Sequence, residues 1–196
     1  MNLKGSKTYE NLMRAFAGES QARNRYNIAA SEARNEGFQV IEAIFNYTAD
    51  QERAHAKVFY QKLSEAAGDN ISISGAYPVD LYGSTAKALR AAQHNELEEW
   101  EKVYSSFGKI AREEGFIEIA NTFESIARIE KTHADRFGRI ADELENGTLF
   151  KKNEEIAWIC TNCGHIHIGK EAPGICSVCQ HPRGFFMPFD ESFAQK

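Results

Sequence analysis

Four long stretches of this chain repeat apolar residues at alternating spacings of three and four, the period of a helix that buries one face. Gly37 and Gly115 suit short turns between neighbouring stretches, whereas the segment 68–83, which contains Pro78, is a longer and irregular connection. The sequence therefore predicts a mainly α protein, with two helical hairpins joined by one crossover into a four-helix bundle. The expected helices cover roughly residues 6–36, 40–67, 84–114 and 117–145.

Acidic residues and histidines interrupt the apolar stripes at corresponding places. The second stretch contains Glu52-x-x-His55, the fourth contains Glu130-x-x-His133, and the first contributes Glu19. Because residues three apart lie on one face of a helix, each pair presents a carboxylate and an imidazole side by side. Buried carboxylates need partners, and metal ions are the partners that this combination favours.

The third stretch adds two acidic residues one turn apart, Glu96 and Glu99. A Glu from each of two helices and a Glu-x-x-His from each of the other two is the ligand pattern of di-iron carboxylate bundles. Oxygen and nitrogen ligands suit iron, and manganese or zinc to a lesser degree. The second carboxylate of the third stretch leaves room for a ligand that moves when the charge of the metals changes. The candidate bundle ligands are Glu19, Glu52, His55, Glu96, Glu99, Glu130 and His133.

Two other interpretations of these residues remain open. The glutamates are surface charges if the helices are phased differently, and Glu99 in particular lies in an acidic run that faces solvent in that case. Internal ion pairing without metal is the second alternative. It is disfavoured because Arg23 is the only basic residue of the stripes, and an unpaired buried ion costs several kcal/mol.

Tyr26 and Tyr104 lie near the same stripes and are the candidate catalytic side chains. A phenol at either place would donate a hydrogen bond to a carboxylate or pass a proton. The alternative is a core aromatic residue with a satisfied hydroxyl.

All four cysteines lie in the last part of the chain, as Cys160-x-x-Cys163 and Cys176-x-x-Cys179. Two such pairs at this separation hold one tetrahedral metal through four thiolates. The metal is either an iron that carries one electron or a zinc that only folds the tail. We expect a helical domain at 1–146 and a linker (148–156) with a small β-rich module at 147–196.

Composition excludes several classes of partner. The net charge of -5 gives no electrostatic reason to bind nucleic acid or an anionic membrane. No run of apolar residues is long enough to span a bilayer, and the first residues show no secretory signal. The cysteine usage fits a reducing cytoplasm.

With these motifs in this order, followed by WICTNCG and CSVCQHP, the chain resembles the rubrerythrin family over essentially its whole length. The second knuckle reads Cys179-Gln-His-Pro and lacks the Pro and Gly of free-standing rubredoxin. The resemblance implies a ferritin-like bundle with a rubredoxin-like domain. It also implies a non-haem di-iron peroxidase that reduces hydrogen peroxide to water.

The resemblance further implies the role of each site. The seven bundle residues would be di-iron ligands, with one iron exchanging Glu99 for His55 between redox states. The four cysteines would hold an iron that passes on electrons from a reductase or a rubredoxin-type carrier. A head-to-tail homodimer would bring the cysteine site of one subunit near the bundle site of the other. The alternatives are a ferroxidase or iron-handling protein, and a zinc-ribbon protein that docks a partner.

Overall fold

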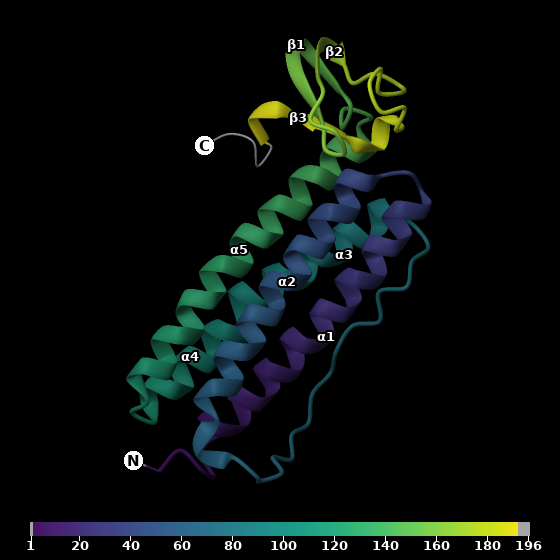
Figure 1. The fold of residues 1–196 in the computed structure, drawn as a ribbon. Helices are drawn as coiled ribbons and strands as arrows, with labels where there is room; N and C mark the ends of the chain where they lie inside the picture. Colours follow the sequence, from purple (N-terminus) through teal and green to yellow (C-terminus); the bar gives the residue numbers. More distant parts are fainter. Residues whose placement is uncertain (1, 192–196) are drawn as a thin grey trace.

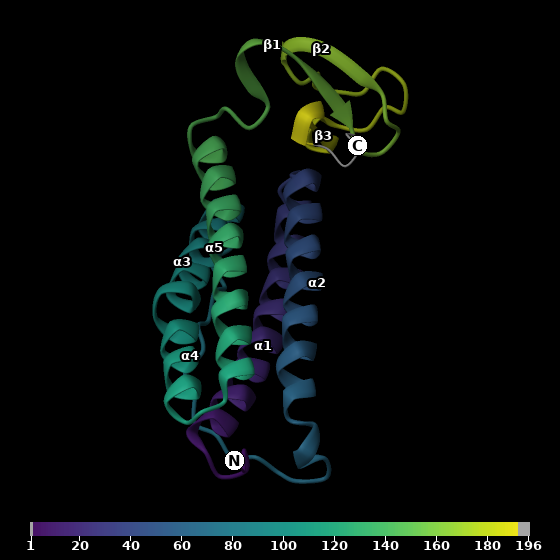
Figure 2. The same cartoon turned by 90° about the vertical axis from the view of Figure 1, so that its left-hand side faces the viewer.

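The computed structural model describes residues 2–191 and confirms the mainly helical bundle with a small C-terminal module (Figure 1). The first two helices form one hairpin, and the remaining helical segments form the other (Figure 2). A crossover joins the two hairpins and runs the length of the bundle beside the first helix. The helices are α1 (Lys7–Asn35), α2 (Gln39–Lys62), α3 (Thr85–Glu98), α4 (Tyr104–Glu113) and α5 (Ile117–Glu145), with a 3-10 turn η1 (Ser64–Ala66) after α2 and a π-helix η2 (Glu99–Val103) between α3 and α4.

Glycines end the long helices where the sequence predicts turns. Gly37 has φ +84° and Gly115 has φ +83°, a left-handed conformation that glycine adopts without steric cost. After each glycine a phenylalanine closes the helix end, because Phe38 N–H donates to Ala33 O and Phe116 N–H donates to Ala111 O. Both hairpin turns are therefore built in the same way.

The helices bury two separate apolar clusters. One cluster, near the C-terminal module, includes Phe45 and Phe137, and the other, near the N-terminus, includes Phe59 and Phe123. Charged residues that are almost fully buried lie between them, in the middle of the bundle. This polar layer separates the two clusters, and apolar side chains pack on both sides of it.

The third bundle helix differs from the sequence expectation of one unbroken helix over 84–114. A π-helix, η2, occupies Glu99–Val103. A π-turn inserts one extra residue into a helix, and such insertions are frequent at functional sites. Here the insertion begins at Glu99, one of the predicted metal ligands.

The C-terminal module is a three-stranded antiparallel sheet in the order β2-β1-β3. Strand β1 already begins at Lys151, so the prediction of a linker over 148–156 is wrong for most of that segment. The prediction failed because the first half of β1 consists of polar residues that are mostly exposed. Such a segment lacks the alternation of apolar and polar residues from which a strand is predicted. The elements are β1 (Lys151–Cys160), β2 (Ile166–Glu171), β3 (Phe186–Pro188) and the 3-10 turns η3 (Arg183–Phe185) and η4 (Phe189–Glu191).

The module packs on the end of the bundle that carries the α1–α2 turn (Figure 2). At the closest approach, a Cβ on Gly184 would lie 1.9 Å from Gly37 O, so only glycine fits at this position. Met187 and Phe150 pack against the nearer apolar cluster. In the described part of the chain, no helix combines the length and apolar character that crossing a membrane requires.

Candidate metal centres

The polar layer of the bundle collects side chains from all four bundle helices. Each is at most 7% exposed, although each is charged or titratable. Helical spacing places them there, since Glu52 with His55 and Glu130 with His133 lie one turn apart on inward faces. The buried members are Glu19 on α1, Glu52 and His55 on α2, Glu96 on α3, and Glu130 and His133 on α5.

These six residues form two groups whose ligand atoms lie within 4.8 Å of one another. Glu52 and Glu130 belong to both groups, which is the arrangement of carboxylates that bridge two cations. The first group is Glu19, Glu52, His55 and Glu130, and the second is Glu52, Glu96, Glu130 and His133.

Several ligand atoms of the layer lie close together without forming hydrogen bonds, although His55 Nδ1 and Glu52 Oε2 do form one at 3.1 Å. His133 Nδ1 lies 2.8 Å from Glu130 Oε2 and 3.1 Å from Glu52 Oε1, yet among the described residues none of these three atoms has a hydrogen-bond partner. A buried polar atom without a partner costs on the order of 1–3 kcal/mol. Atoms aimed at a common point rather than at one another fit a cation at that point, so the donor set fits metal ions.

Burial and mutual repulsion perturb the ionisation of the layer when no metal is bound. Burial, together with Glu52, raises the pKa of Glu96 to about 8, and burial together with Glu130 raises the pKa of Glu19 well above its ordinary value. Burial opposes ionisation of Glu52 as well, but contacts with His133 and His55 outweigh it and lower its pKa to about 2. When no cation is bound, protons on carboxyl groups such as Glu19 and Glu96 must therefore reduce the negative charge of the layer.

Both predicted tyrosines reach the layer from the apolar clusters. The Tyr26 hydroxyl donates a hydrogen bond to Glu96 Oε1, and the Tyr104 hydroxyl donates one to Glu19 Oε1. Tyr26 lies in the cluster near the module and Tyr104 in the cluster near the N-terminus. Each tyrosine thus holds one carboxylate from the side away from the centre of the layer.

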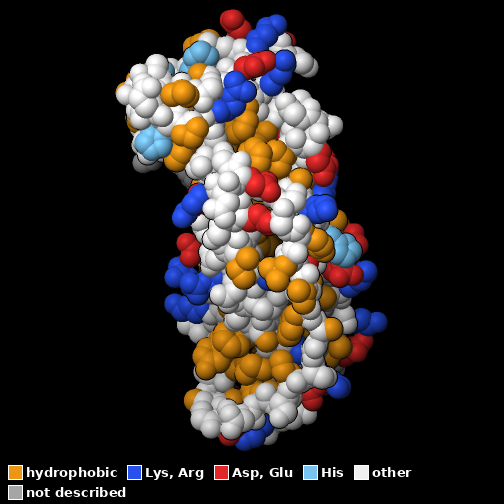
Figure 3. Space-filling model, turned by 90° about the vertical axis from the view of Figure 1, so that its right-hand side faces the viewer, with side chains coloured by type: hydrophobic (Ala, Val, Ile, Leu, Met, Phe, Trp, Pro, Cys, Tyr) orange, Lys and Arg blue, Asp and Glu red, His pale blue; other side chains and the backbone are white. Residues whose placement is uncertain are grey.

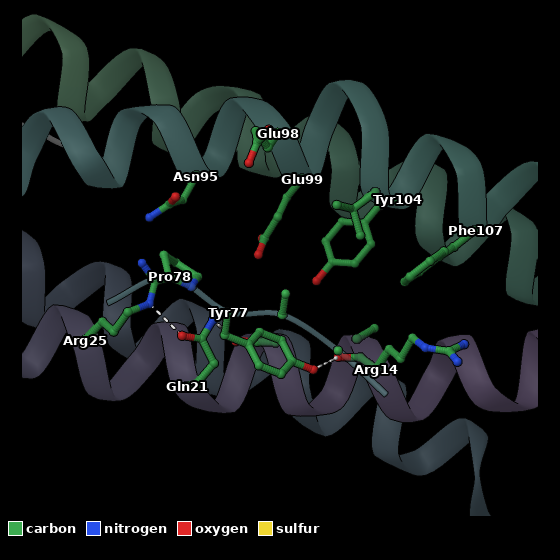
Figure 4. Close-up of a pocket in the computed structure, with 15 residues that line it drawn as sticks. Arg14, Gln21, Arg25, Tyr77, Pro78, Asn95, Glu98, Glu99, Tyr104 and Phe107 are labelled. Atoms are coloured by element: carbon green, nitrogen blue, oxygen red, sulfur yellow. Dashed lines mark hydrogen bonds between the residues drawn. The ribbon is translucent and has the colours of Figure 1, made fainter. Parts of the chain in front are cut away.

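The structure does not bring Glu99 into either ligand group. Its side chain is half-buried and lines a cavity on the outer side of the layer, facing α1 and the crossover (Figure 4). Burial raises its pKa well above the ordinary value, and Glu19 adds to this. Glu99 is not fully exposed, because its side chain is partly buried and points toward α1 and the crossover (Figure 4).

The sequence analysis missed the crossover residue Tyr77. This side chain lines the same cavity. Burial raises the pKa of its phenol, Arg14 partly opposes this rise, and Glu99 adds to it. No periodic pattern could have placed it, since the crossover has no regular structure. The sequence offered only an aromatic residue beside Pro78 in a long connection.

The four cysteines of the module converge as the spacing predicts. Cys160 Sγ lies 3.7 Å from Cys179 Sγ, and Cys163 Sγ lies 3.7 Å from Cys176 Sγ. A tetrahedral metal with bonds of about 2.3 Å to sulfur separates its ligands by roughly 3.8 Å. All four thiols are free, so the set fits one metal rather than two disulfides.

The two knuckles of this site have the same backbone plan. Cys160 N–H donates to His165 O, and Cys176 N–H donates to His181 O. The residue after each second cysteine is left-handed, with φ +77° at Gly164 and φ +61° at Gln180. The second knuckle thus has the same left-handed turn as the first, with Gln180 at the position that Gly164 occupies in the first knuckle.

Comparisons with known proteins agree with this architecture. The family model described as Rubrerythrin matches residues 10–141, and the model described as Rubrerythrin, rubredoxin-like domain matches residues 158–187. A curated rubrerythrin of Porphyromonas gingivalis is 44% identical over 192 residues, covering 98% of this chain and 94% of its own length.

Solved structures extend the likeness to three dimensions. Fully reduced nigerythrin superposes with a TM-score of 0.63 at 27% identity, over 95% of this chain and 91% of its own. Desulfovibrio desulfuricans bacterioferritin shares the fold. It superposes with a TM-score of 0.65 at 24% identity, over 72% of this chain and 82% of the bacterioferritin chain. The bundle thus carries a di-iron site of glutamate and histidine ligands, and residues 160–179 carry a four-cysteine site of rubredoxin type.

Proposed function

The chain belongs to the rubrerythrin family of di-iron oxidoreductases, and from this membership we propose that it is a peroxidase that reduces hydrogen peroxide to water. One observation carries the proposal. Two metal sites of different chemistry occur in one chain, a buried carboxylate and imidazole site and a four-thiolate site. The first suits a two-electron reaction and the second suits delivery of single electrons.

We assign the ligands residue by residue. The bundle irons would be held by the six buried residues of the polar layer together with Glu99, which would exchange with His55 as the charge of the site changes. The single iron is held by Cys160, Cys163, Cys176 and Cys179.

The reaction consumes one peroxide, two electrons and two protons, and it yields two water molecules. A pair of ferrous ions bound in the polar layer would supply both electrons at one place, so that no radical would need to leave the site. The chain supplies orientation and protons. Tyr104 and Tyr26 hold Glu19 and Glu96 by hydrogen bonds, and their hydroxyls are proton donors beside the layer.

Electron delivery favours a homodimer. From His133 to the end of α5 at Glu145 the helix rises about 18 Å, and the module lies beyond that end. The two sites of one chain are therefore far apart, and a second copy in head-to-tail orientation would bring a thiolate site alongside the bundle. A reductase or a rubredoxin-type carrier is the proposed donor, and the four free thiols support the proposal of a cytoplasmic location.

A peroxide-consumption assay on iron-loaded protein with an artificial electron donor tests the proposal. We expect the wild-type protein to turn over, and we expect Glu52→Ala to lose turnover by about 100-fold or more, because Glu52 belongs to both ligand groups. The visible thiolate absorption should be unchanged in this variant. Glu101→Ala, at an exposed position of η2, is the control.

Full activity in Glu52→Ala would show that the bundle site is not the reaction centre. Ferrous iron oxidation without peroxide turnover would instead indicate a ferroxidase. A colourless protein with one zinc per chain would indicate a zinc ribbon and remove the electron-entry site.

A further inference from the structure

A cavity of about 270 Å³ lies directly outside the bundle site, between α1, the π-helix and the crossover (Figure 4). Glu99 and Tyr104 line it on the side opposite α1 (Figure 4). Of the seven assigned bundle ligands, Glu99 is the one that is not buried, and Tyr104 donates a hydrogen bond to Glu19. The cavity therefore borders the most accessible ligand of the site, and its volume is well above the room that one water molecule needs.

The crossover forms the outer wall of the cavity. Two contacts fix this segment to α1, one from Arg14 Nε to Ser74 O at 3.0 Å and one from Arg25 Nη1 to Asp80 Oδ2 at 2.5 Å. Between these two contacts the Tyr77 ring lies over the cavity, and its hydroxyl donates to Arg14 O at 3.3 Å. Tyr77 is 42% exposed, so it stands between the solvent and the cavity.

Gly18 on α1 keeps the cavity wide. Glycine in a helix interior costs about 1 kcal/mol relative to alanine. A Cβ at Gly18 would meet only the Tyr77 ring, at 3.8 Å, which is ordinary contact. Close helix packing therefore does not require this glycine, and a side chain longer than alanine at this position would extend toward the Tyr77 ring.

The charges around the cavity suit a neutral guest. The two arginines of the wall are neutralised, since Arg14 pairs with Glu10 at 2.9 Å and Arg25 pairs with Asp80. Glu98 also lines the cavity and pairs with Lys102 at 2.9 Å, so among the described residues Glu99 is the lining carboxylate without an ion pair. Hydrophobic side chains also emerge along the bundle on the side where the crossover runs (Figure 3). A small, uncharged, hydrogen-bonding molecule is favoured over an anion.

We propose that this cavity is the entry pocket for the peroxide and that Tyr77 sets the size of the molecule that reaches Glu99. Hydrogen peroxide passes beside the ring, and a bulky organic hydroperoxide does not. The inference rests on the proposed function for the identity of the substrate. The pocket itself rests on the arrangement of Gly18, Tyr77 and Glu99.

Removing the ring should open the pocket. In Tyr77→Ala, we expect the ratio of kcat/KM for cumene hydroperoxide to kcat/KM for hydrogen peroxide to rise roughly tenfold. Tyr82→Ala is the matched control, because Tyr82 is an exposed crossover tyrosine outside the pocket. Equal selectivity for the two hydroperoxides in Tyr77→Ala and the wild-type protein would overturn the assignment of Tyr77.

Filling the pocket should close it. In Gly18→Leu, we expect azide to bind the oxidised, iron-loaded protein about tenfold more slowly by stopped-flow absorbance, with the iron content unchanged. Tyr77→Ala should not slow this binding. The charge of azide is the same for every variant, so the ratio of rates reports passage through the pocket. An unchanged azide rate in Gly18→Leu would show that ligands enter elsewhere.

The two proposals fail in different ways. Wild-type protein that consumes no hydrogen peroxide contradicts the proposed function, and the azide rates still decide whether the pocket is the entry. Normal peroxide turnover, with unaltered hydroperoxide selectivity and azide rates in both variants, contradicts the pocket and leaves the function standing.

Discussion

His133 Nδ1 lies 3.1 Å from Glu52 Oε1, and this pair joins α5 to α2 across the centre of the bundle. The reciprocal pair has nearly the same length, since His55 Nδ1 lies 3.0 Å from Glu130 Oε1. Each Glu-x-x-His motif therefore places its imidazole on the carboxylate of the other motif. The two halves of the chain meet with approximate twofold symmetry, which is the geometry that two equivalent cations require.

The tyrosines repeat this symmetry and provide the first prediction. Tyr104→Phe and Tyr26→Phe each remove one donor from a buried carboxylate, Glu19 or Glu96. We expect peroxide turnover to fall about tenfold in each variant, since a hydrogen bond to a charged group contributes roughly 1.5 kcal/mol or more. Iron content should not change. Steady-state assays with iron analysis measure both quantities.

Tyr9→Phe is the control, because Tyr9 packs in the same apolar cluster as Tyr104 and belongs to neither ligand group. Unchanged turnover in the Tyr104 and Tyr26 variants would show that both residues serve only as aromatic residues of the core.

The second prediction concerns the pH dependence of the protein without metal. The pKa of Glu96 is raised to about 8, mainly by burial. A carboxyl of this kind stabilises the fold fully below its unfolded pKa of about 4.5, and the contribution is lost as the pH rises toward 8. His133 acts in the same direction above pH 6.5, because its contacts with Glu130 and Glu52 overcome burial and raise its pKa to about 12.

Between pH 5 and 8, the free energy of unfolding of the metal-free protein should therefore fall, by on the order of 1 kcal/mol per pH unit. The lowered pKa of Glu52 matters only below pH 4.5. Denaturant titrations followed by helical circular dichroism measure the slope, and Glu96→Gln should flatten it. Stability that rises with pH in the metal-free protein would contradict the ionisation described for the layer.

The third prediction concerns the contact between module and bundle. A Cβ on Gly184 would lie 1.9 Å from Gly37 O and 2.1 Å from Gln39 Oε1, so Gly184→Ala must displace backbone. We expect a loss of roughly 1–3 kcal/mol and faster proteolysis between α5 and β1. Gly174→Ala is the matched control in the same module, because its Cβ would meet nothing within 4 Å. Equal protease resistance in the two variants would mean that the module is not held at Gly184.

The sequence predicted the parts of the structure that follow a period or a fixed spacing. Helical phase placed Glu52 and His133 in the interior, and the cysteine spacing placed Cys160 beside Cys179. Helix-ending glycines marked both hairpin turns. These features are local, so a few neighbouring residues determine them.

The rest depends on tertiary packing. The apolar pattern does not predict the π-helix at Glu99–Val103. This π-helix begins at Glu99, the one predicted bundle ligand that lies outside both ligand groups. The place of Tyr77 follows from how an irregular crossover lies on α1. The start of β1 at Lys151 depends on pairing with β2. The residues between 148 and 156 contain no pattern that predicts this pairing.

An anaerobic titration of metal-free protein with ferrous iron tests the central claim most directly, that buried carboxylates and imidazoles hold two irons while four thiolates hold a third. We predict about three ferrous ions per chain in the wild-type protein, about one in Glu52→Ala and about two in Cys163→Ala. A single tightly bound iron in the wild-type protein, with no further loss in Glu52→Ala, would contradict the account.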